Sequence, residues 1–161
     1  MNTKEVYNAL ILGIRDYFKK NNFKKAVIGL SGGLDSSVAI SLVVKALGKQ
    51  NVTAILMPDI GTTSPISIKN ADMLVKKLKI KNCKITINDF VQYFKNINKK
   101  LKIKDQIYAI SNVKARTRMM ILYYFANIEN ALVIGTSDKS EIALGYTTKF
   151  GDNAADILVI G

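Results

Sequence analysis

Apolar residues follow two different spacings along this chain, and the two spacings alternate. Short continuous runs of mostly β-branched residues predict buried strands at residues 25–28, 52–57, 84–87 and 131–135. Between these runs, apolar residues recur three and four positions apart, which is the spacing of one helix face. This spacing predicts helices from Asn2 to about Asn21 and over residues 38–47, 71–78, 88–97 and 111–128.

Strands that alternate with helices favour a parallel sheet with helices on both faces, joined by right-handed crossovers. We expect a three-layer α/β/α fold of one domain, residues 1–161, with four or five strands in the order 3-2-1-4. In that order, a ligand crevice should open between the carboxyl ends of strands one and four. The lysine-rich residues 95–104 should form an exposed connection. Residues 157–160 should start a further strand that packs inside the domain or against a second subunit.

The composition favours a globular protein with its own core. Hydrophobic residues make up 48% of the 161, which is enough for a sizeable core. No apolar run approaches the length of a membrane span, about 18 residues, and the amino terminus shows no signal-peptide pattern. A soluble cytoplasmic protein is therefore expected. Cys83 is the single cysteine, which excludes an internal disulfide and favours a reducing compartment.

The chain contains no histidine, so no Cys–His or Ser–His pair can activate a nucleophile. Any chemistry must therefore depend on positioning, charge and metal ions. The net charge of +12 comes from 24 Lys and Arg against 12 Asp and Glu. Only three of the 24 are arginine, and the lysines are scattered without interleaved aromatic residues. We expect a solvated basic surface and no nucleic-acid partner.

Residues 28–37, Ile-Gly-Leu-Ser-Gly-Gly-Leu-Asp-Ser-Ser, connect the first predicted strand to the helix that follows. In such a turn, backbone N–H groups at the helix amino terminus point toward an incoming anion. The glycines at 32–33 let the backbone approach a phosphate closely, and the hydroxyls of Ser31 and Ser36 add donors. Asp35 would repel phosphates unless a cation lay between them, so it predicts Mg²⁺. The loop predicts a site for nucleotide phosphates, with an ordinary capped turn as the alternative.

A second motif lies on the predicted long helix, where Asn112, Arg116 and Arg118 follow in Asn-x3-Arg-x-Arg spacing. Asn112 and Arg116 are four residues apart and share a helix face, whereas Arg116 and Arg118 point about 200° apart. Two arginines so close, in a chain with few others, predict bidentate recognition of a carboxylate or phosphate. We expect Arg116 to make this contact rather than Arg118. A surface ion-pair helix is the alternative.

Polar residues also follow the last predicted strand. Thr136 can bond a ribose or an adenine edge, and Glu141 can offer Mg²⁺ a second carboxylate opposite Asp35. Capping of a short helix by Thr136 or Ser137 is the alternative. Residues 145–156 then form a loop with several glycine and asparagine turn positions, one lysine and two aspartates, which is typical of a substrate-binding loop.

The Ser-Gly-Gly-x-Asp-Ser sequence of the glycine loop resembles the pyrophosphate loop of the ATP pyrophosphatases, which bind ATP and attack its α-phosphate. Three further motifs follow in order: Asn-x3-Arg-x-Arg, Gly-Thr-x4-Glu and Gly-Tyr-x-Thr-Lys-x-Gly-Asp-x-Ala-x-Asp. Together the four resemble the ammonia-dependent NAD⁺ synthetases, from the first helix to the last residue. The resemblance implies a Rossmann-like fold and a homodimer, with ATP, deamido-NAD⁺ and ammonia as substrates and Mg²⁺ as the metal ion.

The resemblance also implies a role for each matching position. The ATP phosphates would be held by the glycine loop, namely Gly29, Leu30, Ser31, Gly32, Gly33, Leu34, Asp35 and Ser36. ATP would also contact Thr136, and Mg²⁺ would be held by Asp35 and Glu141. Deamido-NAD⁺ would contact Arg116, Lys149 and Asp156. Asp35 and Lys149 would act in catalysis.

The family pattern continues beyond Gly161 with a further ATP-binding lysine and a flexible loop, so a share of the usual site lies outside this sequence. We therefore expect weak Mg·ATP binding and low synthetase activity from these 161 residues. A non-catalytic nucleotide-binding remnant of the family is one alternative. A tRNA-modifying or amidating pyrophosphatase is another, although that group usually needs metal-binding cysteines or an RNA-binding extension.

Overall fold

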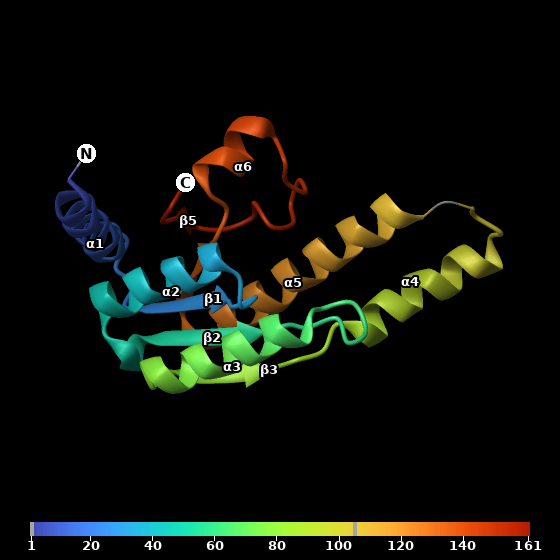
Figure 1. Ribbon diagram of the computed structural model, residues 1–161, viewed down its shortest axis with the longest axis horizontal. Coiled ribbons are helices and arrows are strands. Elements are labelled where there is room, and N and C mark those ends of the chain that lie inside the picture. The colour runs from blue at the N-terminus through green and yellow to red at the C-terminus, as the bar shows by residue number, and fades with distance from the viewer. Residues whose placement is uncertain (1, 105) are drawn as a thin grey trace.

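The computed structural model describes residues 2–104 and 106–161, and its centre is a parallel sheet in the order β3-β2-β1-β4-β5 (Figure 1). The strands are β1 (Lys25–Gly29), β2 (Val52–Leu56), β3 (Lys81–Lys84), β4 (Ala131–Gly135) and β5 (Ile157–Leu158). β1 pairs with β2 on one side and with β4 on the other, both in parallel. The predicted fold class and strand order are confirmed. The change of direction lies between β1 and β4, as expected.

Helices cover both faces of this sheet, and Figure 1 shows α2 and α3 in front of it. Alternate residues of each strand point to opposite faces. Ala26 and Ile28 of β1 therefore pack with α1, α2 and α3, whereas Val27 packs with α4 and α5. The helices are α1 (Thr3–Lys20), α2 (Leu34–Leu47), the 3-10 helix η1 (Lys49–Asn51), α3 (Pro65–Leu78), α4 (Asn88–Lys100), α5 (Ile107–Glu129) and α6 (Lys139–Leu144).

The third strand lies earlier than predicted, at Lys81–Lys84 rather than at residues 84–87. The chain after it still runs along β2, because Ile85 N donates to Leu56 O and Ile87 N donates to Pro58 O. Ile87 is fully buried. The apolar residues that suggested the strand therefore mark where the chain enters the core, just beyond the regular ladder.

Three helices begin before their apolar stripes. Their first residues are Leu34 in α2, Pro65 in α3 and Ile107 in α5, each at least four positions ahead of the prediction. Leu34 and Ile107 are exposed, so the spacing of buried residues does not mark these first turns. Pro65 suits the first helical position, where no intrahelical partner for its missing N–H is needed.

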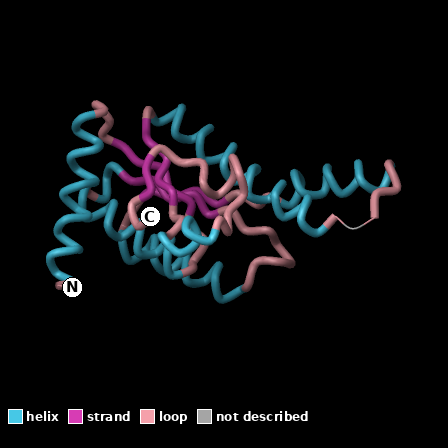
Figure 2. Tube along the Cα trace, turned by 90° about the horizontal axis from the view of Figure 1, so that it is seen from above, coloured by secondary structure: helices cyan, strands magenta, loops and turns pink. Residues whose placement is uncertain are grey.

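Residues 95–104 are largely exposed, as predicted, but only residues 101–104 lie beyond the end of a helix, because α4 continues to Lys100. The expectation of an irregular backbone is therefore wrong for residues 95–100. Lysine is a good helix former, and the Lys-rich composition reflects solvent exposure rather than irregular backbone. In Figure 2, α4 and the first turns of α5 form a hairpin that projects from the sheet. Several of its apolar side chains are exposed, including Tyr93, Phe94 and Tyr108.

The apolar end of the chain packs inside the domain, as one of the two expected outcomes. Val159 is buried, and Ile157 and Ile160 pack against the core that contains α1 and α2. Within residues 2–104 and 106–161, no helix combines the length and the apolar character needed to cross a bilayer.

A polar cluster of Thr53, Lys81 and Glu129 lies where β2 and β3 begin and α5 ends, and it supports a prediction about stability. The carboxylate of Glu129 accepts hydrogen bonds from Thr53 Oγ1 at 2.8 Å and Lys81 Nζ at 2.7 Å. Thr53 is buried, whereas Lys81 is largely exposed, so solvent partly screens its ion pair with Glu129. Replacing Glu129 with alanine should leave the Thr53 hydroxyl without its acceptor and lower the free energy of unfolding by roughly 1–2 kcal/mol. Urea titration at neutral pH measures this loss.

The same cluster should make stability depend on pH. Burial raises the pKa of Glu129, but hydrogen bonds from Lys81 and Thr53 outweigh burial and hold the pKa below its ordinary value of 4.5. A carboxyl with a lowered folded pKa stabilises the protein above its unfolded pKa, and this stabilisation is lost as pH falls through the folded value. The difference between wild type and Glu129→Ala should therefore shrink below pH 4.5. A difference that stays constant down to full protonation would contradict this account.

Candidate active site

A cavity of about 370 Å³ opens at the carboxyl ends of β1, β2 and β4. Ala71 of α3 and Met119 of α5 also line the cavity, and most of the other lining side chains are apolar. This is the position at which open parallel sheets bind ligands. The polar and charged residues on its lining are Ser31, Thr63, Lys84, Arg118, Thr136 and Asp152.

The glycine loop forms the rim of this cavity between β1 and α2. Ser31 Oγ and Ser36 Oγ lie 3.0 Å apart, and Gly33 N donates to Ser31 Oγ at 3.2 Å. Ser37 Oγ donates to Gly33 O at 2.6 Å. These contacts hold the first turn of α2 against the loop, so its backbone N–H groups and hydroxyls meet at one place. Such an arrangement suits a phosphate.

Gly32 is the position in the loop where no other residue fits. Its φ of +82° lies in the left-handed region, which favours glycine. A Cβ at this position would overlap the backbone carbonyl oxygen of Ser67 in α3. The glycine loop is therefore packed directly on the backbone of α3.

Asp35 lies exposed in the first turn of α2, beside this rim. Its oxygen donors fit Mg²⁺, which commonly takes one or two carboxylates together with phosphate oxygens and water.

Glu141, the second predicted magnesium ligand, has a structural role, because it forms a capping box with Asp138 at the start of α6. Its Oε2 accepts from Asp138 N at 3.3 Å, and its own N–H donates to Asp138 Oδ1 at 2.7 Å. Asp138, and neither Thr136 nor Ser137, is the cap.

The described residues contain no cluster of three or more His, Cys, Asp or Glu side chains with metal-binding geometry.

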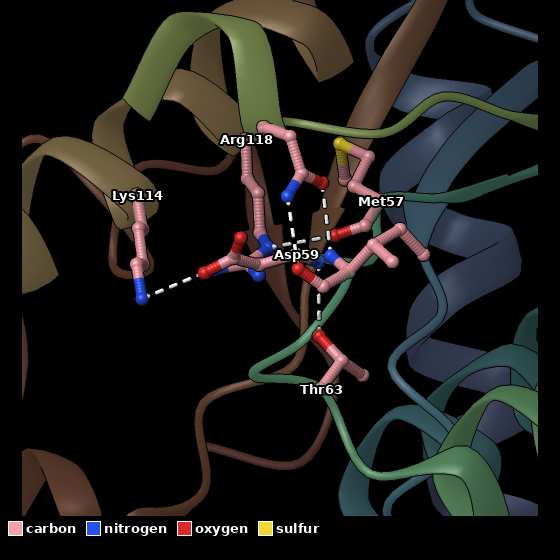
Figure 3. Close-up of polar contacts among 7 residues, drawn as sticks. Met57, Asp59, Thr63, Lys114 and Arg118 are labelled. Atoms are coloured by element: carbon pink, nitrogen blue, oxygen red, sulfur yellow. Dashed lines mark hydrogen bonds and ion pairs between the residues drawn. The ribbon is translucent and has the colours of Figure 1, made fainter. Parts of the chain in front are cut away.

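The segment after β2, residues 57–63, forms one wall of the cavity and is fixed by buried charges (Figure 3). Lys114 Nζ lies 2.7 Å from Asp59 Oδ2, and Arg118 Nε donates to Met57 O at 3.2 Å. Thr63 Oγ1 accepts from Asp59 N at 2.9 Å. Burial raises the pKa of Asp59, but its hydrogen bonds and the nearby lysine charges outweigh burial and leave the pKa lowered. Asp59 therefore remains a carboxylate.

Gly151 and Asp152 line the opposite wall of the cavity, and the segment that carries them, residues 145–152, also rests on α5. Thr148 Oγ1 donates to Asn112 Oδ1 at 2.9 Å, and Arg116 Nε donates to the carbonyl oxygen of Lys149 at 3.2 Å. The Lys149 ammonium is exposed and lies 5.0 Å from the centre of the Phe150 ring. Arg116 thus supports the backbone of this segment through Nε. The Arg116 side chain as a whole is exposed.

Asp156 is bound within the fold. Its Oδ2 accepts from Val133 N at 2.7 Å, and its Oδ1 accepts from Tyr123 Oη at 3.3 Å. Burial raises the pKa of Tyr123, and the negative charge of Asp156 raises it further. The Asp156 carboxylate therefore links the residues just before β5 to β4. A contact between Asp156 and a substrate remains a prediction.

The sequence as a whole also matches a known family. The family model for NAD synthase matches residues 6–161. The chain belongs to the NAD synthase family. The NH(3)-dependent NAD(+) synthetase of Fusobacterium nucleatum is 46% identical over 162 residues, covering 100% of this chain and 60% of that enzyme. The chain thus spans about 60% of the length of this curated relative.

Solved NAD synthetases share the fold. The glutamine-dependent NAD⁺ synthetase of Acinetobacter baumannii, in complex with ADP, superposes with a TM-score of 0.93 at 30% identity, covering 99% of this chain and 30% of that one. The NMN synthetase of Francisella tularensis superposes with a TM-score of 0.89 at 36% identity, covering 99% of this chain and 65% of that one. The resemblance of the four motifs to NAD⁺ synthetases is confirmed.

In this member of the NAD synthase family, the predicted site residues fall into two groups. Gly29, Leu30, Ser31 and Thr136 line the cavity, and the rest of the glycine loop forms its rim. The other predicted residues, Arg116, Glu141, Lys149 and Asp156, do not line it. Arg118, Lys84 and Asp59 contribute to the cavity or its wall without having been predicted. Arg118 belongs to the Asn-x3-Arg-x-Arg motif, but the sequence did not show which side of α5 faces the sheet.

Proposed function

We propose that this chain carries the ATP-binding and amidation chemistry of an NAD⁺ synthetase, which converts deamido-NAD⁺ to NAD⁺ with ammonia. The observation that carries the proposal is the glycine loop at the rim of a cavity of about 370 Å³, at the carboxyl ends of β1 and β4. A solved relative of the same fold is a complex with ADP, which supports a nucleotide as a ligand of this chain.

The nucleotide would lie with its phosphates on the glycine loop and its sugar and base in the apolar cavity. Backbone N–H groups of the loop and the hydroxyls of Ser31 and Ser36 donate to phosphate oxygens. Asp35 would hold Mg²⁺, with Glu141 as a second carboxylate. When bound, the metal ion neutralises charge on the phosphates. Thr136 would contact the sugar or base of ATP.

The second substrate would meet the nucleotide from the side of residues 145–156, through Arg116, Lys149 and Asp156. The nicotinate carboxylate attacks the α-phosphorus, pyrophosphate leaves, and an acyl-adenylate forms. Ammonia then displaces AMP and gives the amide. This chemistry needs no histidine, because orientation and charge stabilisation supply most of the rate in phosphoryl transfer. Lys149 would stabilise the negative charge that develops.

A mononucleotide substrate is a second candidate, because an NMN synthetase is 36% identical to this chain. The two candidates differ only in whether the nicotinate substrate carries an adenylate. The purified chain should be supplied with Mg·ATP, ammonium and either deamido-NAD⁺ or nicotinate mononucleotide, and the products separated by chromatography. We expect NAD⁺ from the dinucleotide at the higher kcat/KM. Amide formed only from the mononucleotide would favour the second candidate, and ATP binding without amide would favour a nucleotide-binding remnant.

We also propose a homodimer that forms through the hairpin of α4 and α5. The hairpin projects from the sheet and exposes Phe90, Tyr93, Phe94, Ile107 and Tyr108. Two such hairpins can bury these side chains against each other as four packed helices. Replacing Tyr93 and Phe94 with lysine should halve the molar mass measured by light scattering and leave the helical signal unchanged. A wild-type chain that is monomeric at high concentration would contradict the proposal.

A further inference from the structure

Four polar side chains of α5 contact the two segments that form opposite walls of the cavity. Asn112 and Arg116 bind Thr148 Oγ1 and the carbonyl oxygen of Lys149. Lys114 and Arg118 bind the carboxylate of Asp59 and the carbonyl oxygen of Met57. Every second residue from 112 to 118 therefore contacts one wall or the other in turn.

The spacing explains how one helix reaches both walls. Residues four apart share a helix face, so Asn112 and Arg116 form one pair and Lys114 and Arg118 form the other. The two pairs point about 200° apart, which directs them to opposite sides. Ala115 and Met119 line the cavity between them. Further along α5, Ile121 and Ala126 are buried against the sheet, which fixes the helix in place.

We propose that α5 is a two-sided clamp that sets the distance between the cavity walls, and that Lys114 and Asn112 are its positioning residues. Lys114 fixes the wall at residues 57–63, and Asn112 fixes the wall at residues 145–152, which carries Lys149. The consequence for ligands rests on the proposed function, whereas the clamp itself is a property of the ligand-free protein.

The Lys114 contact is largely removed from solvent. The side chain of Asp59 is 8% exposed and that of Lys114 is 20% exposed. Without Lys114, two cations that act on the charge of Asp59 remain, Lys95 on α4 and Arg118 on α5. Of these, Arg118 is the one already bound to the cavity wall, at Met57 O. The guanidinium would then be drawn from Met57 O toward Asp59, and the cavity wall would move with it.

The Asn112 contact controls the opposite wall. Asn112 Oδ1 accepts from the Thr148 hydroxyl, while Thr148 N donates to Asp152 Oδ1 at 2.7 Å and closes the turn. Gly151 in this turn packs so tightly on α5 that an added Cβ would lie 3.0 Å from Ala115 Cβ. Loss of Asn112 removes the contact at Thr148, next to Lys149, and leaves the hydrogen bond from Arg116 to Lys149 O to hold this wall, without touching the wall at residues 57–63.

Hydrogen–deuterium exchange of the free protein tests the clamp. Lys114→Met should raise exchange in peptides covering residues 57–64 and leave residues 145–152 unchanged, and Asn112→Ala should do the reverse. Lys114→Arg keeps the charge and should restore protection. Lys76→Met, a solvent-exposed lysine on α3, is the matched control and should change neither peptide. Equal increases in both peptides, or none, would overturn the proposal.

Ligand binding then tests the consequence of the clamp. Lys114→Met should weaken Mg·ATP binding by about tenfold in calorimetry, and Asn112→Ala should raise the KM for deamido-NAD⁺ by a similar factor with little change in ATP affinity. If both variants weaken both ligands equally, the residues have only a general structural role. If the wild-type chain binds neither ligand, the proposed function fails, and the exchange experiment still decides the clamp.

Discussion

Gly32→Ala should weaken Mg·ATP binding about 100-fold or more while leaving the sheet folded. Gly32 has a φ of +82°, and an added Cβ would overlap the backbone carbonyl of Ser67. Neither can be relieved by a side-chain rotation, so the glycine loop must move away from α3. A displacement of about 1 Å at a reacting group is enough to cost roughly 10²-fold in rate. Calorimetric titration of Gly32→Ala with Mg·ATP should therefore show at least about 100-fold weaker binding.

Two neighbouring variants separate this effect from a general loss of stability. Gly33 has an ordinary φ of −77°, and its added Cβ would meet only the Ser31 hydroxyl, at 3.3 Å. Gly33→Ala should therefore weaken binding less than Gly32→Ala does. Gly13 in α1 has open space around it, and Gly13→Ala should leave ATP affinity unchanged. Near-normal affinity in Gly32→Ala would show that phosphates do not bind on this loop.

Loss of the Asp35 carboxylate should give the second large effect, a fall in turnover of about 10²-fold to 10³-fold. Asp35 is the carboxylate in the first turn of α2, where the phosphates are proposed to lie. Without it, Mg²⁺ would lose one of its two proposed carboxylate ligands, and Glu141 alone would remain. Asp35→Ala should weaken Mg·ATP binding in calorimetry and flatten the dependence of turnover on magnesium concentration.

Asp89 offers a matched control for Asp35. It is also an exposed aspartate in the first turn of a helix, α4, and lies outside the cavity. Asp89→Ala removes the same charge from an equivalent helix position, so it should leave magnesium dependence unchanged. An unaltered magnesium dependence in Asp35→Ala would remove the metal assignment.

The glycine loop and the sheet order could be predicted because local chemistry specifies them. A β-branched run, the pair of glycines and an apolar helix fix the turn between β1 and α2, and right-handed crossovers restrict the strand order. The start of α5 and the length of α4 could not be predicted in the same way. Their terminal turns are exposed, so no burial pattern marks them, and tertiary packing decides where each helix ends.

The residues of the candidate site divide in the same way, into those that local spacing predicts and those that only the packing of the whole fold places. The pairing of Asn112 with Arg116 followed from helix geometry, and both contact the segment at 145–152. Which face of α5 meets the sheet depends on packing across the whole fold, so Arg118 was not expected on the cavity wall. Asp59 gave no local signal either, because its partner Lys114 lies 55 residues further along the chain. The capping role of Glu141, three residues after Asp138, was readable from spacing alone.

We propose that this cavity directs attack on the α-phosphorus of ATP by a nicotinate carboxylate. Exchange of labelled pyrophosphate into ATP measures that step directly, without ammonia. We predict exchange that requires both magnesium and deamido-NAD⁺, that stops when ammonium converts the adenylate to NAD⁺, and that is lost in Gly32→Ala. Release of ADP and phosphate, or exchange that does not depend on deamido-NAD⁺, would contradict the claim.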